Sequence, residues 1–145
     1  MDVCGTYPDR IAAGMALCGG TSLKDVSGLG RLPFWIIHGT ADRAVPVSKS
    51  KTVVESLKRD GNDTRLLYDW LKGANHGAPA RIFYLRKTYE WLFSHSLLDK
   101  DRPARRDMTI GLDDLRRAYG DVRRNAGAPE LIEGPSVIKG EGHEY

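Results

Sequence analysis

Residues 32–46 read LPFWIIHGTADRAVP, and this stretch decides the fold of the chain. Its first six residues, Leu32 to Ile37, form a continuous apolar run that is closed by His38-Gly39. A continuous apolar run, as opposed to an alternating one, is typical of a strand that is covered on both faces, as in a parallel sheet. The sequence therefore predicts a buried parallel strand, with Asp42 in the loop that follows it.

Two more strands and two helices are predicted around this central strand. Residues Ile11 to Leu17 and Thr64 to Trp70 are apolar or strand-forming runs that end in turn signals. Apolar residues at helical spacing predict helices over Val47 to Arg59 and Ala80 to Ser94. Strands that alternate with helices predict an α/β fold, in which about three parallel strands carry flanking helices.

The character of the sequence changes at Asp99, where arginines begin to alternate with acids and apolar residues become sparse. We therefore divide the chain into an α/β unit over residues 1–98 and a charged tail over residues 99–145. One amphipathic helix is expected at Leu112 to Val122. The residues after Gly127 have no periodicity and are expected to be flexible.

Composition excludes several classes of protein. With 145 residues, 41% of them hydrophobic and 28% charged, the chain resembles a soluble globular domain. A net charge of +3 gives no reason to expect a nucleic-acid partner. No apolar run approaches the ~20 residues of a membrane span. The chain starts without a secretory signal, which does not indicate the compartment of a longer parent protein. The sequence does not indicate the oligomeric state either. Cys4 and Cys18 are expected to be free thiols, with a disulfide as the alternative.

Asp42 and His76 are the candidate functional residues. Asn75-His76-Gly77 follows the third predicted strand, as Asp42 follows the second. Loops after neighbouring parallel strands lie at one edge of a sheet, so the carboxylate and the imidazole are expected within hydrogen-bond reach. A histidine can then take a proton from a hydroxyl nucleophile, while the carboxylate fixes its tautomer. The alternatives are a helix-capping role for Asp42 and a solvated loop position for His76.

The remaining polar residues point to no cofactor or metal. Two ligands without a third at a ligand spacing make zinc unexpected, and the glycines form no phosphate-binding turn. We expect His38 to be structural, and His95 and His143 to face solvent. Four serines are expected to serve in turns and caps and not as nucleophiles: Ser22, Ser27, Ser48 and Ser50.

The sequence resembles the C-terminal half of an α/β-hydrolase over residues 2–97. Pro33 through Pro46 is similar to the family's acid-bearing strand and loop, His-Gly-x-x-Asp-x-x-Val-Pro, and Asn75-His76-Gly77 is similar to its histidine loop. Tyr7 to Ala13 resembles the segment after the nucleophile helix, and Cys18-Gly19-Gly20 the end of the next strand. The branch that it resembles contains secreted esterases, polyhydroxybutyrate depolymerase-like enzymes and prolyl-oligopeptidase-like peptidases.

This resemblance implies a serine hydrolase that cleaves ester or amide bonds of small-molecule or peptide substrates. Asp42 would be the acid and His76 the base of its triad, and the serine, in a Gly-x-Ser-x-Gly turn, is expected upstream of Met1. The 145-residue chain by itself is then expected to be inactive and only marginally folded. The alternative is a noncatalytic α/β binding module that retains a hydrolase remnant and binds a partner through the helix at 112–122.

Overall fold

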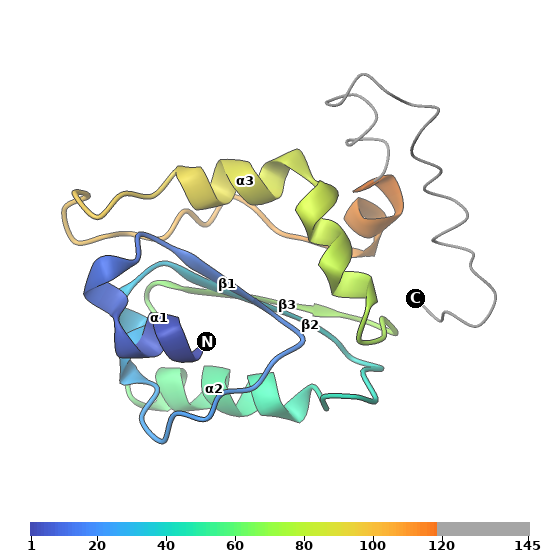
Figure 1. The fold of residues 1–145 in the computed structure, drawn as a ribbon, viewed down its shortest axis with the longest axis horizontal. Coiled ribbons are helices and arrows are strands. Elements are labelled where there is room, and N and C mark those ends of the chain that lie inside the picture. Colours follow the sequence, from blue (N-terminus) through green and yellow to red (C-terminus); the bar gives the residue numbers. More distant parts are fainter. Residues whose placement is uncertain (119–145) are drawn as a thin grey trace.

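The computed structural model describes residues 1–118, and within them a parallel sheet of three strands forms the centre (Figure 1). The strands are β1 (Gly14–Leu17), β2 (Phe34–Gly39) and β3 (Leu66–Leu71), in the order β1-β2-β3. Both pairings are parallel. This arrangement confirms the predicted α/β class and the predicted number of strands.

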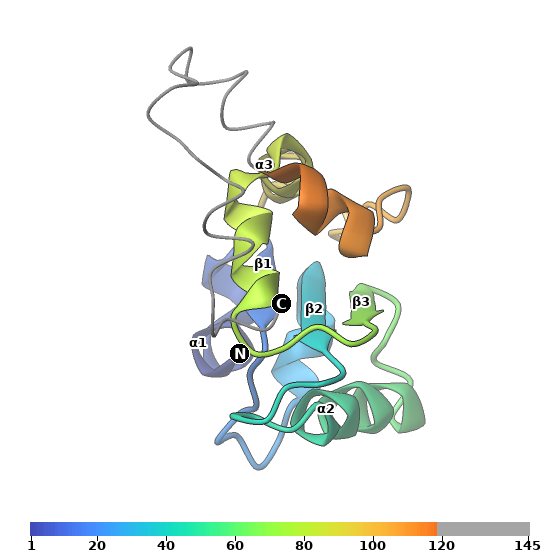
Figure 2. The same ribbon diagram turned by 90° about the vertical axis from the view of Figure 1, so that its right-hand side faces the viewer.

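Helices cover both faces of the sheet (Figures 1 and 2). The helix α2 (Ser48–Arg59) lies on one face and α3 (Arg86–Phe93) on the other. Successive side chains of a strand point to opposite faces, so Phe34 and Ile36 of β2 pack in the core on the α2 side, whereas Trp35 and Ile37 pack on the α3 side. All six residues of β2 are buried, which explains its unbroken apolar sequence.

Four shorter helical elements lie before, between and after the strands. They are α1 (Asp2–Thr6) and the 3-10 helices η1 (Pro8–Arg10), η2 (Ser27–Arg31) and η3 (Ala78–Tyr84). The segments α1, η1 and η2 precede β2, and α1 packs against η2. Within residues 1–118, no helix is long and apolar enough to span a bilayer.

The helix predicted over Ala80 to Ser94 is interrupted in the structure. Leu85 is extended, with φ −94° and ψ 131°, and separates η3 from α3. The hydroxyls of Thr88 and Tyr89 donate to the carbonyl oxygens of Ile82 and Phe83, which lie just before this break. Side chains thus replace helical hydrogen bonds, and the change of direction lets Leu85 join the core. Apolar spacing alone does not reveal such a break.

Residues 99–118 pack onto the α3 side of the sheet. Ile110 and Leu115 belong to the same core as Trp35, and residues 112–118 are helical. The indole of Trp91 donates to the carbonyl of Arg105 at 2.8 Å. The rest of the helix expected up to residue 122, and the tail expected after residue 127, lie outside the described residues.

His95 differs from its predicted position at the surface. It is buried, its Nδ1 donates to the carbonyl of Trp91 at 2.7 Å, and its Nε2 accepts from the backbone N–H of Arg105 at 3.0 Å. Burial lowers the pKa of His95, so the neutral ring is favoured. The expectation of a solvent-facing His95 is therefore wrong, and His143 lies outside the described residues.

Candidate active site

The two loops that carry the predicted acid and base are neighbours because β2 and β3 end together. Gly39, the last residue of β2, pairs with Leu71, the last residue of β3. Beyond the sheet, the N–H of Thr40 donates to the carbonyl of Leu71 at 2.9 Å, and that of Ala41 to the carbonyl of Ala74 at 3.0 Å. These bonds continue the strand pairing into the loops and hold them side by side.

Gly39 permits this close approach. A Cβ added at this position would lie 2.2 Å from the carbonyl oxygen of Ala74 and 2.9 Å from that of Asn75. Any larger residue would push the β3–η3 loop away from the end of β2. The glycine is therefore part of what positions the site, although it carries no functional group.

Asp42 lies in a tight loop and is only 8% exposed. Its Oδ1 accepts two backbone hydrogen bonds from its own loop, from the N–H of Ala44 at 2.9 Å and of Val45 at 2.8 Å. A carboxylate that accepts the N–H groups of the following residues stabilises the turn and is held by it. The other oxygen, Oδ2, is then left for side chains.

His76 meets that second oxygen. Its Nδ1 lies 2.8 Å from Asp42 Oδ2, and its side chain is 51% exposed. Its loop is held by Asn75, whose Oδ1 accepts from the N–H groups of Gly77 and Ala78, each at 3.1 Å. The structure thus brings together the two residues that the sequence singled out. Because a carboxylate only accepts, Nδ1 carries the hydrogen, which leaves the Nε2 lone pair of a neutral ring to take up a proton.

Electrostatics keep Asp42 ionised. Burial raises the pKa of Asp42, but hydrogen bonds from the Val45 N–H, from His76 and from the Ala44 N–H outweigh it and lower the pKa to about 2. A buried carboxylate that stays charged at neutral pH can stabilise positive charge on the imidazole beside it.

A second histidine contacts the same carboxylate. His38 is completely buried at the end of β2, and its Nε2 lies 3.1 Å from Asp42 Oδ2 and 2.9 Å from the carbonyl oxygen of Val45. The predicted structural role did not include this contact. The spacing of four residues in His38-Gly-x-x-Asp42, across a turn, is the sequence signal that could have suggested it.

Ser50 differs from its predicted role in a turn or a cap. It lies in α2, fully buried, with Oγ 2.7 Å from His38 Nδ1. The signal for its burial was available, because Ser50 shares helical spacing with the buried residues Val53, Val54 and Leu57. A serine on the apolar face of a helix indicates a buried hydrogen bond.

Cys18, His38 and Asp42 are the described residues that come nearest to a metal-binding set. Their ligand-capable atoms lie within 4.8 Å of one another. The histidine Nε2 and the carboxylate Oδ2 are, however, already joined by a hydrogen bond. The thiol is protonated, because burial, together with the charge of Asp42, raises the pKa of Cys18 to about 11 against the lowering effect of the Gly39 N–H. Hydrogen bonds therefore account for the cluster.

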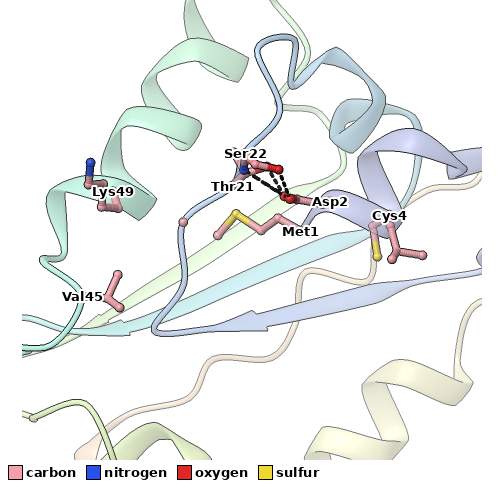
Figure 3. A pocket seen from close by; sticks show the side chains of 9 residues that line it. Met1, Asp2, Cys4, Thr21, Ser22, Val45 and Lys49 are labelled. Atoms are coloured by element: carbon pink, nitrogen blue, oxygen red, sulfur yellow. Dashed lines mark hydrogen bonds between the residues drawn. The ribbon is translucent and has the colours of Figure 1, made fainter.

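A pocket of about 660 Å³ lies behind the Asp42 loop, between that loop, α2 and the N-terminal segment (Figure 3). Val45 lines it, but neither Asp42 nor His76 does. Its one carboxylate, Asp2, points to Thr21 and Ser22 and accepts hydrogen bonds from both hydroxyls and from the N–H of Ser22. The pocket is thus separate from the pair of Asp42 and His76.

The parallel sheet with helices on both faces, and with a buried aspartate and a histidine in the loops after neighbouring strands, fits the class of α/β-hydrolases. More specifically, the chain belongs to the prolyl oligopeptidase family, whose model matches residues 22–98. The match contains both loops of the candidate site.

A solved structure described as a thermostable esterase is similar to this chain, with a TM-score of 0.57 and 25% sequence identity. The similarity covers 65% of this chain and 27% of the esterase, so the chain spans about a quarter of the length of that protein. The comparison with curated proteins found no match.

Proposed function

We propose that Asp42 and His76 are the acid and the base of a Ser-His-Asp hydrolase that cleaves ester bonds. The observation that carries this proposal is the 2.8 Å hydrogen bond between the buried Asp42 Oδ2 and Nδ1 of a half-exposed His76. One nitrogen of the ring is oriented by a permanent charge, and the ring reaches the surface where a substrate could meet it. Family membership and the geometry both favour this assignment over a capping aspartate and a solvated histidine.

In the proposed reaction, His76 Nε2 removes the proton from a serine hydroxyl as its oxygen attacks the carbonyl carbon of the ester. The resulting imidazolium is stabilised by Asp42, which stays ionised throughout. His76 then gives the proton to the departing alcohol, and in the second half of the cycle the same residue activates water to release the acid. The backbone N–H after the serine would help to stabilise the oxyanion.

The serine is proposed to lie upstream of this chain in the whole protein. Two of the described serines point elsewhere, since Ser22 donates to Asp2 and Ser50 faces His38. The similarity to only 27% of an esterase is consistent with the nucleophile belonging to the unmatched part. Ester substrates are preferred because the similar structure is an esterase, and amide substrates are the second choice because the family is named for oligopeptidases.

The first test is the intact mass of the native protein, recovered from its source after treatment with a fluorophosphonate probe. We expect a mass above 16.1 kDa that carries one probe adduct, because the serine would belong to a longer protein. In that protein, His76→Ala should abolish the adduct, whereas Arg43→Ala, an exposed neighbour of Asp42, should not. A mass of 16.1 kDa without an adduct would contradict the proposed function.

The location of the serine has its own test. The purified 145-residue chain is expected not to hydrolyse a p-nitrophenyl ester, because it would lack the nucleophile. Rapid turnover by this chain, lost on His76→Ala, would show that a serine within residues 1–145 serves instead.

A further inference from the structure

Asp42 Oδ2 lies within hydrogen-bond distance of two imidazoles, and the proposed mechanism uses only one of them. His76 Nδ1 is 2.8 Å away and belongs to a half-exposed ring, whereas His38 Nε2 is 3.1 Å away and belongs to a completely buried ring. Both rings approach the same oxygen atom. The position of that atom therefore depends on His38 as well as on the loop that carries it.

The neighbours of His38 determine which of its nitrogens carries a hydrogen. Nε2 faces Asp42 Oδ2 and, at 2.9 Å, the carbonyl oxygen of Val45. Both are acceptors only, so Nε2 must be the donor. His38 thus presents a fixed N–H to the carboxylate from inside the protein, on a ring that solvent does not reach.

Ser50 holds the other side of the same ring. Its Oγ lies 2.7 Å from His38 Nδ1 and 2.7 Å from the carbonyl oxygen of Gly19. A flip of the imidazole would put carbon atoms where these nitrogens are and leave buried polar groups without partners. Each ring nitrogen therefore has a polar neighbour, and the hydroxyl of Ser50 donates its hydrogen to the carbonyl oxygen of Gly19, in the segment that follows β1.

We infer that His38 is a positioning residue for Asp42, and Ser50 a positioning residue for His38, in a buried hydrogen-bond chain that ends at His76. This inference rests on the function proposed above for Asp42 and His76. The chain links the end of β2 and α2 to the loops that follow all three strands. Two loop amides hold Oδ1 of Asp42, and His38 holds Oδ2. The carboxylate therefore cannot rotate about χ2, an angle that varies widely in other aspartates.

The test uses NMR to measure how fast the His76 Nδ1–H exchanges with water in two variants of His38. His38→Leu fills the space without a donor, whereas the amide of His38→Gln can still donate to Asp42. We expect about tenfold faster exchange at His76 in His38→Leu, as for the loss of a hydrogen bond to a charged group, and substantial recovery in His38→Gln.

The indole N–H of Trp35 provides an internal reference for stability. It donates to Asp69 Oδ2 at 2.8 Å, in the core on the opposite face of the sheet, and its exchange should be unchanged in His38→Leu. Ser50→Ala should also accelerate exchange at His76, by less than His38→Leu does. Ser48→Ala, at an exposed position of the same helix, should have no effect at either site.

Two results would overturn the inference. One is unchanged exchange at His76 in His38→Leu, and the other is equal acceleration at His76 and Trp35, which would mean that His38 supports only the fold as a whole. The readout does not depend on catalysis. Absence of a fluorophosphonate adduct in the native protein would therefore reject the proposed function and leave the measured exchange rates as a separate result.

Discussion

At the scale of single residues, Asp42 connects stability to the candidate chemistry. It is buried, and its oxygens accept hydrogen bonds from two loop amides and two imidazoles. The two loop amides and His76 favour the ionised form, so the interactions that would serve catalysis also stabilise the fold. A residue of this kind should make the protein sensitive to acid in a range that its own titration determines.

We predict that the free energy of unfolding falls as the pH is lowered from about 4 to about 2, with Asp42 contributing about 2 kcal/mol. The pKa of Asp42 is lowered in the fold, so its contribution is present above the ordinary aspartate pKa near 3.8 and is lost as the pH falls to about 2. Urea unfolding at several pH values measures this. Asp42→Asn should flatten the acid limb, whereas Asp113→Asn, at an exposed position, should not. Parallel curves for wild type and Asp42→Asn would contradict the prediction.

Ionisation of Cys18 should lower the free energy of unfolding as the pH rises, at the alkaline end of the range. Burial has the largest effect on the pKa of Cys18, and the charge of Asp42 acts in the same direction. Together they raise this pKa from 9.0 to about 11. A raised pKa means that the stabilising contribution is complete below about 9 and is lost as the pH rises to about 11. We therefore predict that the alkaline decline in the free energy of unfolding becomes shallower in Cys18→Ala. An identical slope in both proteins, measured by urea unfolding across this range, would show that the thiol does not contribute.

At the scale of elements, the site depends on how closely two loops approach. Gly39 ends β2 against the backbone of residues 74 and 75, directly before His76. We predict that Gly39→Ala destabilises the protein by about 1–3 kcal/mol, because the added methyl group meets a carbonyl oxygen 2.2 Å away and forces the loop outward. Chemical denaturation would measure the loss, and the NMR signal of the His76 Nδ1–H should weaken as its distance to Asp42 increases.

Gly77→Ala is the matched control for this substitution. Gly77 has φ −83°, a value that any residue adopts, and an added Cβ would have its nearest neighbour 3.9 Å away. It lies on the same loop, immediately after His76, so it tests whether any methyl group there is harmful. Equal effects of the two substitutions would mean that the close contact at Gly39 is not what positions the loop.

The elements that the sequence predicted correctly are those with a simple period. The unbroken run before His38 indicated β2, and the spacing of Val53, Val54 and Leu57 indicated α2. The order of loops after parallel strands was enough to expect Asp42 and His76 to meet. These inferences need only local patterns and the geometry of a parallel sheet.

What the sequence did not reveal depends on the partners of individual polar groups. The break at Leu85 is compensated by two hydroxyls six residues along the chain from their acceptors, and the burial of His95 depends on the backbone of Arg105. The contact of Ser50 with His38 depends on how α2 packs on the sheet. Each of these features depends on the hydrogen-bond partner of a polar side chain, and one-dimensional periodicity contains no information about such partners.

At the scale of the whole molecule, α3 contributes a buried aromatic ring to the core, whereas the end of α3 and the residues just after it expose large apolar side chains. The edge-to-face pair of Trp35 and Trp91, with centroids 5.1 Å apart, joins the sheet to α3. On the outside, Phe93 is 83% exposed and Leu98 is 94% exposed, and Tyr89 stacks on Phe93. Large apolar side chains that are exposed to water promote association. The described sheet also ends in β1 and β3, and sheet edges add to this tendency.

We therefore predict that the 145-residue chain self-associates. The double substitution Phe93→Ser and Leu98→Ser should weaken this association by about tenfold or more. Each apolar side chain contributes on the order of 1 kcal/mol when it is buried between molecules. Sedimentation velocity over a range of concentrations measures this. Thermal unfolding of the double variant should stay close to that of the wild type, since both side chains already face water. Leu29→Ser, at a fully buried position, should instead unfold the chain and increase association. Unchanged sedimentation of the double variant would place the associating surface elsewhere, with the sheet edges as the next region to alter.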